Sequence, residues 1–220
     1  ERLGGTNAIQ FHLEAPHLGS QEIVTNTLAY SDEIKGAWKD IEEGRKVIER
    51  LNAFEEIGDT TEMREWEFDA PHMNFVPSRT VAQTYHARAL LEAAEGNPIE
   101  GARQLAELHS VVRKAFPYTR TLVRKMILVA VAKGNIEVAH RIAAGPQCTP
   151  DVLAVLRDAF PPLQHEDVTL RWTFMTEYLA MKTLCKNKIT NAGFIDSFSL
   201  FKMGEIVNGN SINSLTAMID

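Results

Sequence analysis

Pairs of residues that end one helix and begin the next recur along the middle of this sequence. Gly96-Asn97 and Gly134-Asn135 each join a residue that favours the left-handed end of a helix to a good N-cap residue. Between these pairs, apolar residues recur at intervals of three and four, as in an amphipathic helix, and no segment alternates as a β-strand does. We therefore predict an all-α fold, either a bundle or a short superhelix of helical hairpins, with about eight to nine helices.

The same signals divide the chain into an arm, a domain and an extension. Residues 1–19 lack periodicity and are predicted to form an irregular N-terminal arm. Residues 20–186 are predicted to form one all-helical domain, with its core in two hairpins at 78–144. Residues 187–220 are richer in Asn, Ser and Gly, and we expect them to form a C-terminal extension packed on the same domain.

Residues 31–57 are predicted to form one amphipathic helix with a mostly acidic polar face. Its apolar positions recur at intervals of three, four and seven: Ile34, Trp38, Ile41, Ile48, Leu51 and Phe54. Gly58 would end this helix in the left-handed conformation. The aromatic connector at 59–77 then either packs against the core or covers a groove as a lid.

The first core hairpin is predicted from clear start and stop signals. Its first helix begins at Ser78 and places Ala82, Tyr85 and Ala89 on one face, where small residues allow a neighbouring helix to approach closely. After Gly96, the second helix begins with Asn as N-cap, Pro at the first position and Glu at the third.

The second core hairpin is predicted to contain the most buried helix of the domain. Residues 118–133 are apolar almost all round, which is typical of a helix surrounded by others. Gly134 would end this helix and Asn135 would begin a short one. An Ile127→Asp substitution would then place a charge in the core and unfold the domain.

Three further helices are predicted after the break at Gly145-Pro146, the last of them around Ser197–Val207. Thr149-Pro150-Asp151 is a strong start signal for the first of them. Val168, Trp172, Met175 and Leu179 mark the second, which is about twenty residues long.

Charge is unevenly distributed, although the whole chain carries a net charge of −6. Residues 31–70 hold thirteen acidic and six basic residues, whereas residues 101–150 hold two acidic and eight basic ones. Either these regions are solvated or mutually facing surfaces, or the basic region binds an acidic partner. Such a basic face would contain Arg103, Arg113, Lys114, Arg120, Arg124 and Lys125. The acidic overall balance argues against a nucleic-acid partner, because phosphate binding requires a basic surface.

Motifs that carry catalytic or metal chemistry are not found in the sequence. It contains no Gly-rich phosphate loop, no Gly-x-Ser-x-Gly turn and no His-Glu-x-x-His helix. His12 and His17 match no metal-ligand spacing, and His109 is expected to be a core residue with a hydrogen-bond partner. His86 and His140 are expected on helix surfaces. We therefore predict no catalytic, metal or cofactor site.

Cysteine spacing and hydropathy say little about the compartment. Cys148 and Cys185 have no metal-type spacing and are expected to be free thiols, with one disulfide as the alternative. The longest apolar run, at 126–132, is far shorter than the roughly 20 residues that cross a bilayer. We therefore expect no transmembrane helix in this chain.

Helical-hairpin repeats consist of a helix, a short turn and a second helix that carries a small residue at the contact. This sequence shows the same order around its Gly-Asn pairs. Gly58-Asp59, Gly96-Asn97 and Gly134-Asn135 are spaced 38 residues apart, and Ala102 aligns with Ala139 across the last two. The arrangement resembles a degenerate tetratricopeptide-type repeat, although most of the large aromatic positions of that family are missing. A non-repeat bundle with similar turns is the alternative.

Residues 75–185 also loosely resemble a group of uncharacterised all-helical bacterial proteins. The resemblance rests on the run Ala-Arg-Ala-Leu-Leu-Glu-Ala-Ala-Glu-Gly-Asn, on Ala102 and Leu105, and on Leu122-Val123. Members of that group are often tethered to a membrane by an N-terminal segment, and no chemistry is assigned to them. The resemblance implies a leader or anchor upstream of Glu1 and a place in the bacterial cell envelope, with a cytoplasmic location as the alternative.

The helical architecture and the lack of catalytic motifs favour a non-enzymatic interaction domain. We predict that a protein or peptide partner binds in a groove of the helical stack. The alternative is a small-ligand binder or an enzyme with a pocket between helices, near His109 or Tyr85. An open groove would favour the first function, and an enclosed cavity the second.

Overall fold

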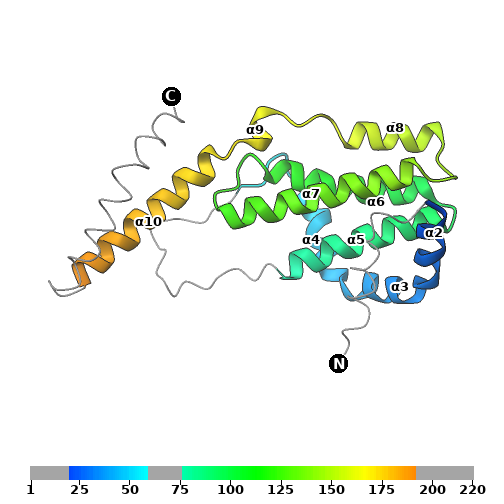
Figure 1. Cartoon of the computed structure of the whole chain (residues 1–220), viewed down its shortest axis with the longest axis horizontal. Helices are drawn as coiled ribbons and strands as arrows, with labels where there is room; N and C mark the ends of the chain where they lie inside the picture. The colour runs from blue at the N-terminus through cyan, green and yellow to red at the C-terminus, as the bar shows by residue number, and fades with distance from the viewer. Residues whose placement is uncertain (1–19, 59–75, 192–220) are drawn as a thin grey trace. The chain divides into compact units, whose positions relative to one another are not determined.

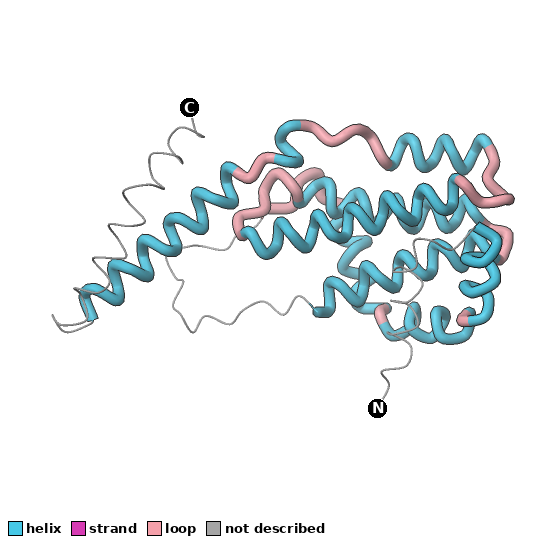
Figure 2. Tube along the Cα trace, in the orientation of Figure 1, coloured by secondary structure: helices cyan, strands magenta, loops and turns pink. Residues whose placement is uncertain are grey.

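The structure, a computed structural model, describes residues 20–58 and 76–191. Within these residues it contains helices and no strand, which confirms the predicted all-α fold (Figure 1, Figure 2). The predicted N-terminal arm, nearly all of the aromatic connector and residues 192–220 lie outside the described residues.

Two compact units divide the chain. The first consists of Glu1–Asp59, Met73–Thr119 and Val123–Val168, and the second of Thr60–His72, Arg120–Leu122 and Thr169–Asp220. The first unit holds α2 (Ser20–Ala29), α3 (Ser31–Asp40), α4 (Glu42–Asn52), α5 (Val76–Ala94), α6 (Pro98–Ala115), all but the first residue of α7 (Leu122–Ala143), α8 (Pro150–Ala159) and α9 (His165–Val168). Residues from Thr169 onward therefore belong to a different unit from the core hairpins, although residues 169–186 fall within the range 20–186 that was predicted as one domain.

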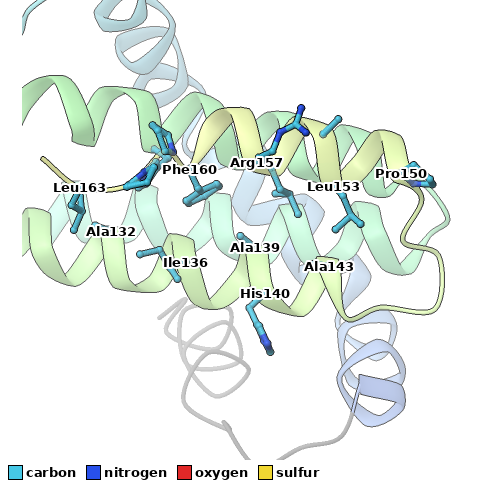
Figure 3. A pocket seen from close by; sticks show the side chains of 15 residues that line it. Ala132, Ile136, Ala139, His140, Ala143, Pro150, Leu153, Arg157, Phe160 and Leu163 are labelled. Carbon is cyan, nitrogen blue, oxygen red and sulfur yellow. The ribbon is translucent and has the colours of Figure 1, made fainter.

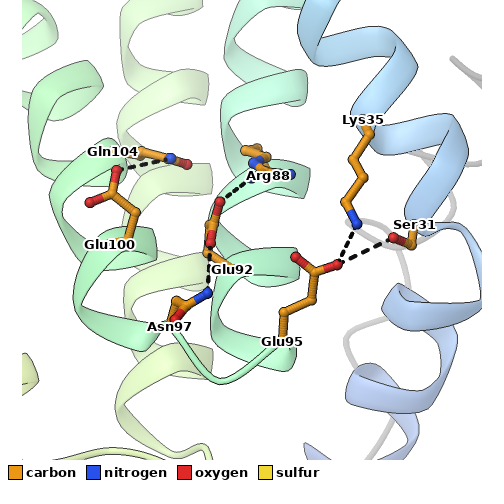
Figure 4. Close-up of polar contacts among 8 residues, drawn as sticks. All are labelled: Ser31, Lys35, Arg88, Glu92, Glu95, Asn97, Glu100 and Gln104. Atoms are coloured by element: carbon orange, nitrogen blue, oxygen red, sulfur yellow. Dashed lines mark hydrogen bonds and ion pairs between the residues drawn. The ribbon is translucent and has the colours of Figure 1, made fainter.

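α5 and α6 form the hairpin predicted around Gly96-Asn97. Gly96 has a φ of +98°, and the amides of Gly96 and Asn97 donate to the carbonyls of Ala93 and Glu92, respectively. These two bonds form a Schellman motif, which satisfies carbonyls at the end of α5. Pro98 occupies the first position of α6 as predicted, but the Asn97 side chain donates to the Glu92 carboxylate instead of capping α6 (Figure 4).

The main apolar core lies where α5, α6, α7 and α8 meet. Its buried members come from all four helices: Ala89, Leu90, Ala102, Leu105, Val138, Ala139, Ile142, Val152 and Leu156. The face predicted for α5 is confirmed, since Ala82, Tyr85 and Ala89 are buried. The small residues on this face allow α6 to pack closely against it.

Gly101 marks a close approach of α6 to α5. A Cβ atom at this position would lie 2.4 Å from the carbonyl oxygen of Ala89, which belongs to the backbone and cannot rotate away. We expect Gly101→Ala to force the two helices apart and to lower the free energy of unfolding by about 1–3 kcal/mol. Urea denaturation followed by circular dichroism measures this loss.

Gly36 provides the matched control, because it also lies inside a helix. A Cβ atom at Gly36 would meet nothing within 4 Å. Gly36→Ala should therefore raise the free energy of unfolding by about 0.5–1 kcal/mol through helix propensity alone. If both substitutions shifted stability in the same direction, the close approach at Gly101 would be refuted.

The single helix predicted over 31–57 is wrong. Two helices, α3 and α4, meet at Ile41, whose φ of −96° and ψ of 17° interrupt the helical path. Ile41 is buried against Ala82 and Tyr85 of α5, and Trp38 packs edge-on against the Tyr85 ring. The bend follows from this contact with α5, which a periodicity of three and four does not reveal.

The turn predicted at Gly134-Asn135 is also wrong, because α7 is continuous from Leu122 to Ala143. The prediction that residues 118–133 form the most buried helix is also wrong. In the first half of α7, Val123, Met126 and Val129 are 53%, 63% and 52% exposed. The buried positions of α7 are Lys125, Ala132, Asn135, Val138, Ala139 and Ile142. From Ala132 onward they follow helical spacing, and Lys125 lies two turns earlier, so α7 packs by one face that includes two polar side chains.

α8 begins where the sequence predicts. Thr149 is its N-cap, with the hydroxyl oxygen accepting from the Val152 amide at 3.4 Å, and Pro150 holds the first helical position. α8 packs on α6 and contributes Val152 and Leu156 to the core.

The second unit contains α10 (Arg171–Asn191), which agrees in length with the predicted helix of about twenty residues. Thr173, Thr176 and Ala180 are its buried residues among those with described side chains. The apolar positions that mark this helix in the sequence, Trp172, Met175 and Leu179, are exposed instead.

Candidate functional site

Three polar side chains form a chain of hydrogen bonds inside the first unit. Nε2 of His86 on α5 lies 2.6 Å from Oδ1 of Asn135 on α7, and Nδ2 of Asn135 lies 3.3 Å from Nδ1 of His109 on α6. The amide oxygen can only accept and the amide nitrogen can only donate. His86 therefore donates from Nε2 and His109 accepts at Nδ1. In the neutral rings this leaves an acceptor at Nδ1 of His86 and a donor at Nε2 of His109.

Gly134 makes room for this polar chain. A Cβ atom at Gly134 would lie 2.5 Å from Cε1 of His86, so the imidazole ring occupies the space that a side chain would fill. A glycine inside a helix lowers stability by about 1 kcal/mol relative to alanine. Glycine is needed at position 134 nevertheless, because any side chain there would overlap with the His86 ring. The Gly-Asn pair thus serves packing between α5 and α7 rather than a turn.

The histidines fall in different environments. His109 is 2% exposed and bonded to Asn135, which confirms its prediction as a core residue with a hydrogen-bond partner. The prediction of a surface position is wrong for His86, which is buried, and confirmed for His140, which is exposed. His12 and His17 lie outside the described residues. Among the described residues, no group of His, Cys, Asp and Glu side chains is placed to hold a metal ion.

Burial keeps both core histidines uncharged at neutral pH. Desolvation lowers the pKa of His86, against the opposing effect of its hydrogen bond to Asn135. Desolvation, and then the positive charge of Arg113, lower the pKa of His109 to about 4, against the opposing charge of Asp167. The neutral ring of His109 keeps Nδ1 free to accept from Asn135, whereas His86 donates to Asn135 from Nε2.

The neutral state of His109 makes stability depend on pH. The unfolded chain binds a proton at this residue below about pH 6.5, whereas the folded chain does so only near pH 4. The stabilising contribution is therefore complete above pH 6.5 and is lost as the pH falls toward 4. We expect the free energy of unfolding of the wild type to fall by roughly 1–2 kcal/mol more than that of His109→Gln between about pH 7 and pH 5.

His109→Gln is the matched variant for this measurement, because glutamine offers an acceptor to Asn135 and does not titrate. Urea denaturation at several pH values gives the two curves, and the other titrating groups contribute equally to both. Parallel curves would show that His109 does not remain neutral in the folded chain.

An open groove of about 780 Å³ lies between α7 and α8 (Figure 3). Ile136, Ala139 and Ala143 follow one another along the α7 wall, and Leu153 and Phe160 come from the opposite side. His109 also lines the groove, and its ring stacks on Phe160 with centroids 4.2 Å apart. The groove therefore has apolar walls and a polar group, the imidazole of His109, beneath them.

Large apolar side chains at this groove remain accessible to solvent. Ile136, Leu153 and Leu163 are each about half exposed, although all three line it. The ionisable residues in the lining are His109, His140 and Arg157, and no carboxylate is among the lining residues. The groove therefore combines exposed apolar walls with basic or neutral ionisable groups.

A second groove, of about 520 Å³, lies between α5 and α7. His86 lines it, together with the polar or charged residues Arg79, Gln83, Lys133 and Glu137. The chain of hydrogen bonds through Asn135 thus connects the walls of two grooves, because His86 lines one and His109 lines the other.

Two residues of the predicted basic face hold the segment around α9 in place. Lys125 is 3% exposed, and its ammonium donates to the carbonyls of Phe116 and Asp167, each at 2.7 Å. Burial lowers the pKa of Lys125. Arg113 pairs with the Asp167 carboxylate at 2.9 Å, and the Gln164 amide donates to the same carboxylate oxygen. The charges of Lys125 and Arg113 are therefore engaged within the first unit.

The other four basic residues lie on α6, on α7 and in the segment before α7. Arg103 is exposed on α6, and Lys114 donates to the Asn52 carbonyl at 2.8 Å. Arg124 is half-buried on α7, and Arg120 belongs to the second unit. Sequence reasoning selected these residues by charge and missed Asn135, because its partners are 49 and 26 residues away along the chain.

Comparison of the chain with protein-family models, with curated proteins and with solved structures found no match. Among the described residues, no helix is long and apolar enough to cross a membrane. Cys148 is a free, half-buried thiol, as predicted.

Proposed function

We propose that this protein is a non-enzymatic interaction domain and that a partner protein docks in the groove between α7 and α8. The observation that carries the proposal is the open apolar groove with half-exposed Ile136, Leu153 and Leu163. Contiguous exposed apolar surface of this kind typically marks a binding site, because water contact with it is unfavourable.

The occupant that fits this groove is an amphipathic helix with acidic residues on its flanks. Two helices form the walls, and an added helix would bury its apolar face between them, as in helix-in-groove recognition. The lining contains Arg157 and no carboxylate, so acidic flanks on the partner would meet no like charge among the lining residues. The groove is open rather than enclosed, which favours this partner over a small ligand sealed between helices.

Peptide binding tests this function directly. The probe is a synthetic amphipathic helix of about 18 residues, roughly five turns, with leucines on one face and glutamates on the flanks. We expect it to bind with micromolar affinity in a fluorescence anisotropy titration, and the same peptide with lysines on the flanks to bind at least tenfold more weakly.

Leu153→Glu should weaken binding of the acidic peptide at least tenfold, because it puts a carboxylate in the groove wall. Leu28→Glu is the matched control: Leu28 is also an exposed leucine, but it lies on α2, which does not line the groove. Both variants should keep wild-type stability. Equal weakening by both variants, or no binding of the acidic peptide to the wild type, would refute the groove as the docking site.

A further inference from the structure

His109 has one ring nitrogen that the core does not use. Its Nδ1 accepts from Asn135, so the proton of the neutral ring is on Nε2. The buried side-chain atoms without a partner among the described residues are Asn52 Oδ1, Arg88 Nε, Gln104 Oε1 and Arg113 Nη1. Nε2 of His109 is not one of them, although no hydrogen bond to it is found in the described part of the chain. We conclude that Nε2 reaches the groove that His109 lines.

We propose that Nε2–H of His109 is the polar anchor of the groove, and that it binds a carboxylate on the apolar face of the docked helix. The proposal rests on the proposed function, since it specifies what the partner helix must carry. An apolar helix without an acceptor would cover Nε2 and leave its N–H dehydrated and unpaired, which is unfavourable. A site built around one donor therefore selects for an acceptor in the ligand.

The charges around His109 favour an anionic acceptor. Arg113 lies one turn further along α6 and pairs with the carboxylate of Asp167 at 2.9 Å. The residues that line the groove include Arg157 and no carboxylate, so the field of the lining groups does not oppose an anion there. A carboxylate placed at Nε2 would gain a charge-assisted hydrogen bond in this field.

The fixed orientation of the ring adds to the selectivity. Asn135 holds Nδ1 as an acceptor, and Phe160 stacks on the ring with an angle of 25° between the two planes. A donor held in place by packing and by a second hydrogen bond loses little conformational entropy on binding. The polar chain through Asn135 therefore sets both the tautomer and the direction of the donor.

The test uses the acidic amphipathic peptide with one central position on its apolar face varied as Glu, Gln or Leu. Binding to the full chain is measured by fluorescence anisotropy. For the wild type we expect the Glu peptide to bind most tightly, the Gln peptide a few-fold more weakly and the Leu peptide about tenfold more weakly. For His109→Phe, which lacks the donor, the Leu peptide should bind at least as well as the Glu peptide. His109→Gln, which keeps an N–H donor, should restore the wild-type order.

The outcomes separate this proposal from the docking groove. Equal binding of the three peptides to the wild type would overturn the carboxylate anchor and leave the groove intact. No binding of any of them would overturn the groove and the anchor together. Nitrogen chemical shifts of the His109 ring in the free protein provide a measurement that needs no peptide or variant. The Nε2–H tautomer is expected, and an Nδ1–H tautomer would overturn the anchor.

Discussion

Val138→Asp is expected to unfold the first unit at room temperature. Val138 is fully buried on α7 among side chains of α5, α6 and α8. The substitution removes a buried apolar side chain, worth about 1.5–3 kcal/mol, and adds a carboxylate without a partner, which costs several kcal/mol more. The sum approaches the total stability of an ordinary domain, about 5–15 kcal/mol. Circular dichroism should show loss of helicity and of the cooperative thermal transition.

Val129→Asp is the control on the same helix. Val129 is 52% exposed, so the new carboxylate remains in water and the free energy of unfolding should change by less than about 1 kcal/mol. Ile127, which the sequence places in the core, is only half-buried. Ile127→Asp should therefore fall between the two valine variants. If Val129→Asp were as damaging as Val138→Asp, the exposed face of α7 would be misassigned.

Asn135→Leu is expected to lower the free energy of unfolding by about 3–5 kcal/mol. Leucine has the same number and branching of side-chain heavy atoms as asparagine but removes both hydrogen bonds, leaving the buried Nε2–H of His86 and Nδ1 of His109 without partners. Each buried polar group left unpaired costs about 1–3 kcal/mol. Urea denaturation at neutral pH measures the loss.

Asn97→Leu is the control for Asn135→Leu, because Asn97 is exposed and its side chain does not cap α6. It should cost less than about 1 kcal/mol. The combination of Asn135→Leu with His86→Phe should cost less than the sum of the two single changes, since the second removes a group that the first leaves unpaired. Additive losses would show that His86 and Asn135 are not coupled.

The helical class and most helix starts were predictable, because they depend on local signals. Pro98 and Thr149-Pro150 are found at the predicted starts, and Gly96 adopts the predicted left-handed conformation. Each of these features is fixed by residues within one or two turns of each other. Local chemistry is sufficient for them.

The errors in the predicted helices have a common cause. The bend at Ile41 and the continuity of α7 through Gly134 both depend on contacts with α5, through Tyr85 and His86. Glycine and asparagine are typical of turns between helices, and they also occur inside helices at close or polar contacts. Sequence alone cannot separate the two uses.

The candidate site was less predictable than the fold. His109 was correctly placed in the core, but its partner Asn135 was assigned to a helix cap and Lys125 to a surface. Hydrophobicity alone predicts that polar residues face water. Asn135 and Lys125 face inward because groups far away in the sequence provide their hydrogen-bond partners. The groove itself requires α7 and α8 to be positioned side by side, which no local pattern specifies.

The sequence by itself determined that the chain is helical and where its α5–α6 hairpin turns, since helix propensity and capping act over a few residues. Tertiary structure alone decided which face of α7 is buried. A buried amide is stable only when its oxygen and nitrogen both find partners, and Asn135 finds them on α5 and α6. The same long-range pairing leaves Val123, Met126 and Val129 exposed and places His109 in the lining of the groove.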